Sequence, residues 1–157
     1  GMPELIEVLK NPGTANPFEF EFVGPVNASN RVNAPQIKYH GIVTGQKALQ
    51  GILDQCHVMV VPSWSEGMPN VIMEGMARGL AIVATDVGAV QALVTEKNGR
   101  LISPGSVADL RRALVQMTEV SAAQLDQMRH HSRQHVETFV WERVVKMVEK
   151  QIAQRKH

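Results

Sequence analysis

Alternating hydrophobic and polar residues near the start of the chain predict two β-strands. Residues 18–23, Phe-Glu-Phe-Glu-Phe-Val, alternate with a period of two and stop at a Gly-Pro pair, which is typical of a strand and a turn. Residues 37–40 predict a second strand that stops at Gly41, and the polar residues 26–35 are expected to form a loop. A helix over residues 3–10 is expected to precede both strands.

Two continuous apolar runs in the middle of the chain predict buried strands. Residues 58–61 and 81–84 contain no polar side chain, as is typical of strands that helices cover on both faces. Residues 100–102 predict a short edge strand. Before the first run, Thr44 is a candidate cap for a helix. The apolar residues of that helix recur at helical spacing: Leu49, Ile52, Leu53 and Cys56.

The segment between the two buried runs predicts a loop over residues 62–68 and a helix over residues 69–78. Pro69 suits the first helical position, because its missing N–H would be unpaired there anyway. Gly79 is placed to end this helix.

Helices dominate the last third of the chain. Ser106 with Asp109, and Ser121 with Gln124, place a capping oxygen three residues before an acid or amide, which predicts two helix starts. A final helix over residues 140–155 carries an apolar face. That face consists of Val140, Val144, Val145, Val148 and Ile152.

Strands that alternate with helices predict an α/β fold, specifically a three-layer Rossmann-like parallel sheet with its ligand at the carboxyl ends of the strands. The length of 157 residues fits a single domain, residues 1–157. A Rossmann-type unit normally opens with a buried strand, whereas this chain opens with the predicted helix over residues 3–10. We therefore expect the first strand and its following loop to be missing.

Composition narrows the classes of partner. The formal net charge of +1 provides no basic stripe, so we expect no nucleic-acid partner. The single cysteine, Cys56, fits a reducing compartment, and no apolar run approaches the roughly 18 residues of a spanning helix. We expect a cytoplasmic protein; its position at the inner face of the membrane is left open.

Candidate chemistry gathers where the loop over residues 62–68 enters the following helix. The amides of Asn70 and Val71 are expected to be free at the helix start, where the macrodipole is positive and suits a phosphate. Glu74 lies one turn deeper on the same face and could accept hydrogen bonds from a ribose diol. Glu66 lies before the helix, where the transferred group would sit. Acids on both sides of a helix start suit a nucleotide-diphosphate sugar.

At these residues the sequence resembles the family 4 glycosyltransferases of the GT-B fold. Glu66 and Glu74 match the E-x7-E pair, and further matches run in order along the chain from Leu5 onward. They include Val83-Ala84-Thr85-Asp86-Val87-Gly88, Asn98-Gly99, Ser103-Pro104-Gly105 and Phe139-x-Trp141-Glu142. In that family this is the carboxy-terminal, donor-binding domain.

The resemblance implies the role of each site residue. Glu66 is the catalytic candidate and would bind the sugar hydroxyls, whereas Glu74 would bind the ribose. Backbone amides around Gly67 and Met68 would support the donor. The loop of Gly41, Ile42 and Val43 would line the base.

The resemblance also implies the partners. The donor would be a UDP- or GDP-linked sugar, with no metal and no further cofactor. The reaction would retain anomeric configuration and pass the sugar to a glycan or lipid-linked acceptor, as in polysaccharide biosynthesis. The acceptor domain would be absent from this chain, so we expect the isolated chain to be inactive. Peripheral membrane association through the missing half is left open.

The chain departs from the family at several positions. Gly67-Met68-Pro69 stands where the family has Gly-Phe-Gly, and Ala89 and Ala92 replace a glycine and a glutamate. These departures favour one alternative, a non-catalytic sugar-nucleotide-binding module. A second alternative of the same fold is a sugar-nucleotide epimerase, which would need its own acid/base pair near the sugar, and the sequence shows no such pair.

Other residues have mainly structural interpretations. His131 and His135 stand at the i, i+4 spacing that zinc can use, but a solvated helix face is favoured. Trp64 is expected to cover the sheet edge rather than to line the donor site. Arg78 is expected to offset the helix dipole.

Overall fold

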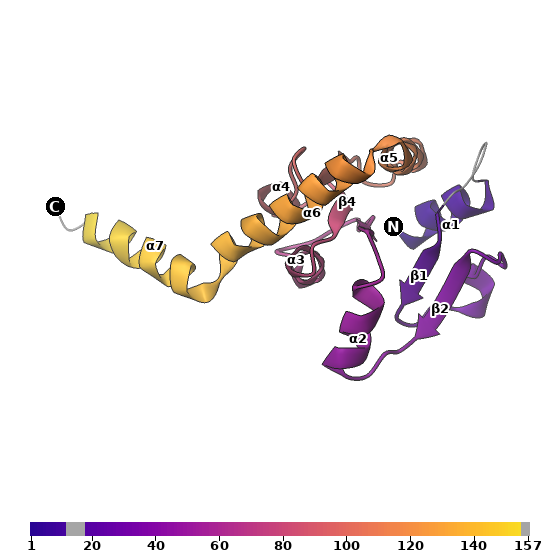
Figure 1. The fold of residues 1–157 in the computed structure, drawn as a ribbon, viewed down its shortest axis with the longest axis horizontal. Coiled ribbons are helices and arrows are strands. Elements are labelled where there is room, and N and C mark those ends of the chain that lie inside the picture. The colour runs from indigo at the N-terminus through magenta and orange to yellow at the C-terminus, as the bar shows by residue number, and fades with distance from the viewer. Residues whose placement is uncertain (12–17, 155–157) are drawn as a thin grey trace.

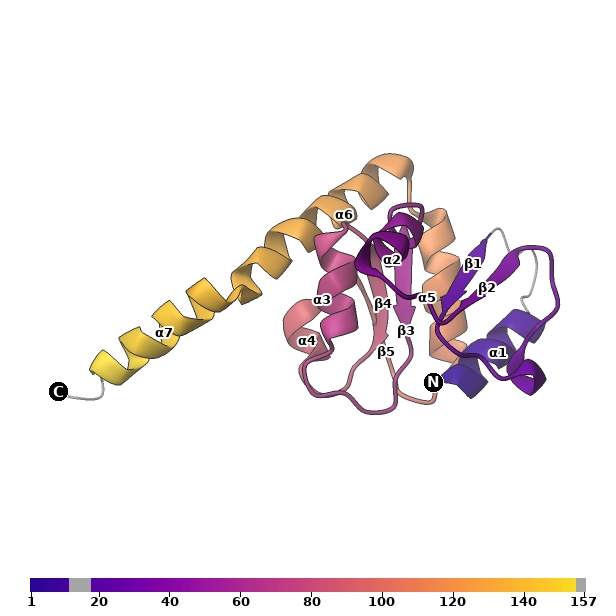
Figure 2. The same cartoon turned by 90° about the horizontal axis from the view of Figure 1, so that it is seen from below.

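The computed structural model describes residues 1–11 and 18–154 as an α/β fold (Figures 1 and 2). In chain order the helices and strands are α1 (Met2–Lys10), β1 (Phe20–Val23), η1 (Ala28–Asn30), β2 (Ile37–Gly41), α2 (Gln46–Leu53), β3 (Val58–Val61), α3 (Asn70–Ala77), β4 (Ala81–Thr85), α4 (Val90–Leu93), β5 (Gly99–Ile102), α5 (Val107–Glu119), α6 (Ala122–Val136), η2 (Glu137–Phe139) and α7 (Trp141–Gln154).

All strand pairs are parallel, as predicted, but the strands form two separate hydrogen-bonded sheets. One sheet has the order β3-β4-β5, and the other pairs β1 with β2. The central strand β4 is buried at all five positions. In β3 only Val61 is buried, so the expectation of full cover on both faces is wrong for Val58, Met59 and Val60. The cause is that β3 has a neighbour on one side only.

Two hydrophobic clusters on opposite faces of the strands define the three layers. On one face, α1 and α5 pack against alternate strand residues such as Ala81 and Val83. On the other face, α3 and α4 pack against Ile82 and Ala84. Because side chains alternate between the two faces of β4, this strand contributes residues to both clusters.

The serine caps hold as predicted. The hydroxyl of Ser106 accepts a hydrogen bond from the Asp109 amide at 3.1 Å, at the start of α5. Ser121 and Gln124 form a complete capping box at the start of α6. Each device satisfies backbone donors that a helix start otherwise leaves unpaired.

The predicted start of α2 is wrong. Gly45, with φ of 100°, occupies the N-cap position, and no side chain caps the helix, so Thr44 has no capping role. The helix also ends at Leu53, which leaves Cys56 beyond it. The Cys56 thiol still donates to the Ile52 carbonyl at 3.4 Å, and burial raises the pKa of this thiol.

The last helix, α7, projects away from the rest of the molecule beyond η2 (Figures 1 and 2). Its predicted apolar face is largely exposed: Val145, Val148 and Ile152 are each about half accessible. Residue 155, the last of the predicted span, lies outside the described residues. Within the described residues, no helix is both long and apolar enough to cross a membrane.

Candidate functional site

The carboxyl ends of β3, β4 and β5 lie at one edge of their sheet, and the loop predicted to bind the donor leaves from the first of them (Figure 2). This donor loop, residues 62–68, runs from the end of β3 to the start of α3. In parallel α/β sheets ligands bind at this edge.

The end of β4 and the turn that follows it fix the backbone of the donor loop through two hydrogen bonds. The hydroxyl of Thr85, which is 2% exposed, donates to the Ser63 carbonyl. The Ala89 amide donates to the Gly67 carbonyl at 2.9 Å. One end of the donor loop is therefore attached to β4, and the other end is attached to the N-cap of α4.

Gly88 makes this close approach of two backbones feasible. Its φ of 54° lies in the left-handed region, and a Cβ at this position would stand 1.9 Å from the Glu66 carbonyl oxygen. A side chain here would displace the donor loop next to Glu66. The glycine is thus a structural requirement of the site.

The helix α3 starts one residue later than the sequence predicts. Pro69 is its N-cap, with an extended ψ of 104°, and its carbonyl accepts from the amides of Ile72 and Met73. The amides of Asn70 and Val71 have no hydrogen-bond partner among the described residues. They are the free donors at the positive end of the helix.

The two acids lie on either side of these free amides along the chain. Glu66 is half-buried in the donor loop, and Glu74 is exposed one turn beyond Asn70. The amides of Gly67 and Met68 also lack a hydrogen-bond partner in the described part of the chain. The donor loop and the first two turns of α3 thus hold six of the predicted site residues: Glu66, Gly67, Met68, Asn70, Val71 and Glu74.

The predicted base-binding residues lie after a different strand. Gly41 ends β2 with a φ of 66°, Ile42 is 75% exposed, and Val43 is half-buried. No hydrogen bond among the described residues joins these three to the donor loop. Gly41 ends a strand of the two-stranded sheet and Ile42 and Val43 follow it, so no backbone hydrogen bond among the described residues ties their position to α3.

Trp64 connects the donor loop to the start of α1. Its indole N–H donates to the Glu4 carboxylate at 3.3 Å, and its ring lies against Gly105 in the loop after β5. The pKa of Glu4 is lowered by its own backbone amide and, to a smaller extent, by this indole. Trp64 therefore lies across the sheet edge, as predicted, although 63% of it is exposed.

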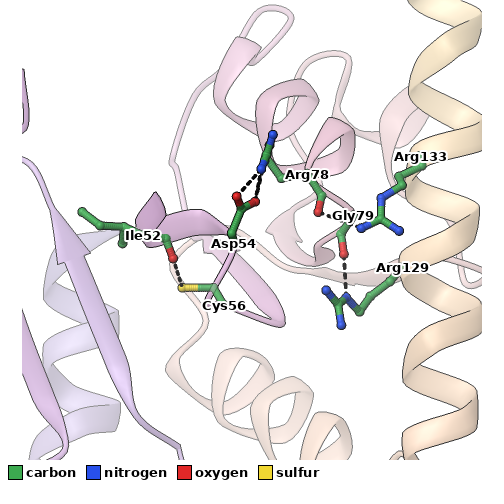
Figure 3. A network of polar contacts seen from close by, with 7 residues as sticks. All are labelled: Ile52, Asp54, Cys56, Arg78, Gly79, Arg129 and Arg133. Atoms are coloured by element: carbon green, nitrogen blue, oxygen red, sulfur yellow. Dashed lines mark hydrogen bonds and ion pairs between the residues drawn. The ribbon is translucent and has the colours of Figure 1, made fainter. Parts of the chain in front are cut away.

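The opposite end of α3 is held by arginines (Figure 3). Arg78 is the C-cap of α3, and its guanidinium pairs with Asp54 rather than with a carbonyl of the helix end. From α6, Arg129 donates to the Gly79 carbonyl at 2.8 Å and Arg133 to the Arg78 carbonyl at 3.3 Å. These contacts fix the far end of the helix whose start faces the site.

A hollow of about 640 Å³ lies away from the donor loop, at the end of the sheet where β5 begins. It is lined by Thr95, Glu96, Lys97, Asn98, His131, Gln134, His135 and Thr138. His135 contacts the Ala92 carbonyl through Nε2 at 2.8 Å, and no group of three metal-ligating side chains occurs in the described residues.

Sequence reasoning missed the contributions of Thr85 and Gly88. Both lie in the segment that resembles the family. Their roles, however, depend on contacts with residues far earlier in the chain: Thr85 contacts Ser63, and Gly88 approaches Glu66 and Gly67. A hydroxyl at the end of a buried strand followed by a glycine turn is the signal that could have identified them.

The chain is similar to known proteins along most of its length. Residues 2–119 match the family described as Glycosyl transferases group 1. The uncharacterized glycosyltransferase MJ1178 of Methanocaldococcus jannaschii is 26% identical over 157 residues, which cover 96% of this chain and 43% of that protein.

Solved structures share the fold. Sucrose-phosphate synthase from Thermosynechococcus elongatus superposes with a TM-score of 0.76 at 21% identity, over 98% of this chain and 42% of that chain. Alr3699/HepE of Anabaena, solved in complex with UDP, superposes with a TM-score of 0.71 at 20% identity, over 99% and 44%. The chain thus spans less than half the length of each of these proteins.

Proposed function

Since this chain belongs to the group 1 glycosyltransferases, we propose that it binds the nucleotide-diphosphate end of a sugar donor at the start of α3. The observation that carries the proposal is the pair of unpaired amides, Asn70 and Val71, beside a donor loop whose backbone is fixed from β4. Fixed N–H donors at a positive helix end suit a diphosphate. The GT-B fold shared with a protein solved with UDP supports the same assignment.

The acids supply the contacts on either side of the diphosphate. Glu74, exposed one turn into α3, accepts hydrogen bonds from the ribose diol. Glu66, in the donor loop, accepts them from the hydroxyls of the sugar. Gly41, Ile42 and Val43, after β2, line the base. In this proposal the helix amides hold the diphosphate without a metal.

The complete enzyme would transfer the sugar with retention of configuration. As the diphosphate departs, the amides at the start of α3 would stabilise its negative charge, because they are already oriented and need no reorganisation. Glu66 is the side chain of this chain that would touch the transferred sugar. The acceptor would be a glycan or a lipid-linked sugar.

The chain alone would transfer no sugar. Holding an acceptor near the anomeric carbon contributes roughly 7–11 kcal/mol to lowering a barrier, and the acceptor contacts would come from another domain. The exposed apolar face of α7 would pack on that domain. Turnover by this chain equal to that of the longer protein, measured with the same donor and acceptor, would rule this proposal out.

Titration calorimetry with substituted chains tests the assignment of roles. A hydrogen bond to a charged group contributes about 1.5–3 kcal/mol, so Glu74→Ala should weaken binding of UDP or GDP by about tenfold or more. Glu66→Ala should leave that affinity nearly unchanged and weaken only the complete sugar nucleotide.

The matched control is Glu96→Ala, an exposed acid in the loop before β5, at the other end of the sheet. It should change neither affinity. Equal losses for Glu74→Ala and Glu66→Ala with the bare nucleotide would reject the assignment. Binding that disappears when a chelator is added would reject the metal-free mechanism.

A further inference from the structure

The two-stranded sheet and the helix that follows it form one segment, residues 19–56, which we call the β1–α2 segment. Ile37 of this segment belongs to the hydrophobic cluster of α1 and α5, and Leu53 packs against the cluster on the α3 side. The helix α2 itself buries none of its residues. Because apolar contacts are non-directional, they do not fix the orientation of α2.

A single side chain of the β1–α2 segment supplies a directional contact. Within the described residues, the ion pairs and hydrogen bonds that join this segment to residues 57–154 all involve Asp54. Arg78 donates to it as a fork: Nε lies 2.7 Å from Oδ1, and Nη2 contacts both carboxylate oxygens (Figure 3). A planar guanidinium that binds both oxygens fixes direction as well as distance.

The arginine half of this ion pair is firmly attached to the rest of the molecule. The Arg78 amide donates to the Glu74 carbonyl at 3.2 Å, and the Arg78 carbonyl accepts from Arg133. Gly79 follows with a φ of 73°, and a Cβ there would stand 2.4 Å from the guanidinium carbon of Arg133. The helix α3 also packs against the three-stranded sheet. A break in the ion pair therefore frees α2 rather than α3.

The charges around Asp54 keep the pair ionised. The hydrogen bond from Arg78 is the main cause that lowers the pKa of Asp54, and the positive charges of Arg78 and Arg133 add to this effect. The carboxylate therefore remains charged at neutral pH and holds the fork of Arg78.

The ion pair joins the far ends of two helices whose starts lie near the proposed nucleotide contacts. Asp54 is the C-cap of α2, which begins shortly after the base loop, residues 41–43. Arg78 is the C-cap of α3, whose start presents the free amides of Asn70 and Val71. Each helix has eight residues, a stiff rod of about 12 Å. Fixing their far ends therefore limits how the two starts can move relative to one another.

We infer that Asp54 and Arg78 are positioning residues for nucleotide recognition, because their ion pair sets the place of the base loop relative to the start of α3. Without the pair, the base loop reaches the base for only part of the time, whereas the amides of α3 still bind the diphosphate. The pair thus contributes to affinity for the nucleoside and not to affinity for the diphosphate. This inference rests on the proposed function.

Titration calorimetry with UDP, GDP and pyrophosphate separates the two contributions, because pyrophosphate has neither base nor ribose. Asp54→Asn keeps the size of the side chain and removes its charge. If the base loop is then in place about a fifth of the time, affinity for the better-bound nucleotide falls about fivefold, since apparent affinity scales with the competent fraction. Affinity for pyrophosphate should be unchanged. Arg78→Lys, which keeps the charge but loses the fork, should lower nucleotide affinity by a smaller factor.

The matched control is Asp126→Asn, an exposed carboxylate that pairs with Arg129 within α6. It should change neither affinity. Asp54→Arg combined with Arg78→Asp should bind the nucleotide more tightly than either substitution alone. Equal losses for the nucleotide and pyrophosphate, or no loss in Asp54→Asn, would overturn the inference and leave the proposed function intact. Nucleotides that bind no more tightly than pyrophosphate to the unsubstituted chain would reject the proposed base contacts and this inference together.

Residual dipolar couplings of the backbone amides test the same inference without any ligand. They report the orientation of α2 relative to β4. In Asp54→Asn the couplings of α2 should shrink relative to those of β4, because motion averages them, whereas Asp126→Asn should leave them unchanged. Couplings of α2 that are the same in Asp54→Asn and in the unsubstituted chain would overturn the inference.

Discussion

The two parallel sheets of this chain use similar strands but differ in how completely they are enclosed. In β4 all five residues are buried, because strands flank it on both sides and helices cover both faces. In β1 no residue is buried, and in β2 only Ile37 is. The face of β1 and β2 away from α1 carries a charged cluster of Glu21, Lys38 and His40 instead.

This difference explains where the donor site can be rigid. The donor loop is fixed by Thr85, the last residue of the fully enclosed strand β4, and by the turn at Gly88 that follows this strand. The base-binding candidates Gly41, Ile42 and Val43 instead follow β2, in the open sheet. The backbone that carries the proposed diphosphate contacts is therefore held more firmly than the backbone that carries the proposed base contacts.

The largest effect should come from a cavity in the enclosed sheet. Ile82→Ala removes a side chain that is fully buried in β4, so it should lower the free energy of unfolding by about 2–5 kcal/mol. Ile52→Ala, in half-buried α2, should cost less than half as much. Urea denaturation measures both. Equal losses would contradict the contrast between the two regions.

A smaller effect is expected from the turn that fixes the donor loop. Gly88→Ala combines a left-handed backbone with a Cβ 1.9 Å from the Glu66 carbonyl oxygen, so it should cost about 1–3 kcal/mol of stability. The matched control is Gly67→Ala, where a Cβ would meet no neighbour within 4 Å. Denaturation midpoints that fall equally for the two variants would show that the close approach of Gly88 to Glu66 does not matter.

The smallest effect should come from the charged cluster of the open sheet. His40 and then Lys38 lower the pKa of Glu21, so its carboxylate stabilises the fold above the ordinary glutamate pKa, and this contribution is lost as pH falls through the lowered pKa. Glu21→Gln should therefore cost about 0–1 kcal/mol at pH 7, and less in acid.

The control for Glu21→Gln is Glu19→Gln, whose exposed carboxylate stands 3.9 Å from Lys38. It should change stability little at any pH. Thermal unfolding from pH 3 to pH 8 measures both variants. A destabilisation by Glu21→Gln that grows toward low pH would have the wrong sign and would refute the role of this cluster.

Local sequence patterns predicted the parts of the fold that depend on near neighbours. The caps at Ser106 and Ser121, the strands around β4, and the loop-to-helix passage at Pro69 all follow from residues within a few positions of one another. The same reasoning failed at Thr44, because Gly45 adopts a φ of 100° and starts α2 by itself.

The site was only partly predictable for the same reason. Glu66, Glu74 and the free amides were identified because they lie on one short segment. The contacts of Thr85 and Gly88 with the donor loop connect segments about 22 residues apart. The burial of β3 depends on which strands flank it. Such long-range pairings leave no periodic signal in the chain.

The most direct test of the account is a titration of the isotope-labelled chain with UDP, followed by amide chemical shifts in the presence of a chelator. The account predicts the largest changes at Gly67, Met68, Asn70 and Val71, whose amides are free beside the fixed donor loop. Changes confined to the hollow around His131 and His135, or no saturable change at the start of α3, would contradict it.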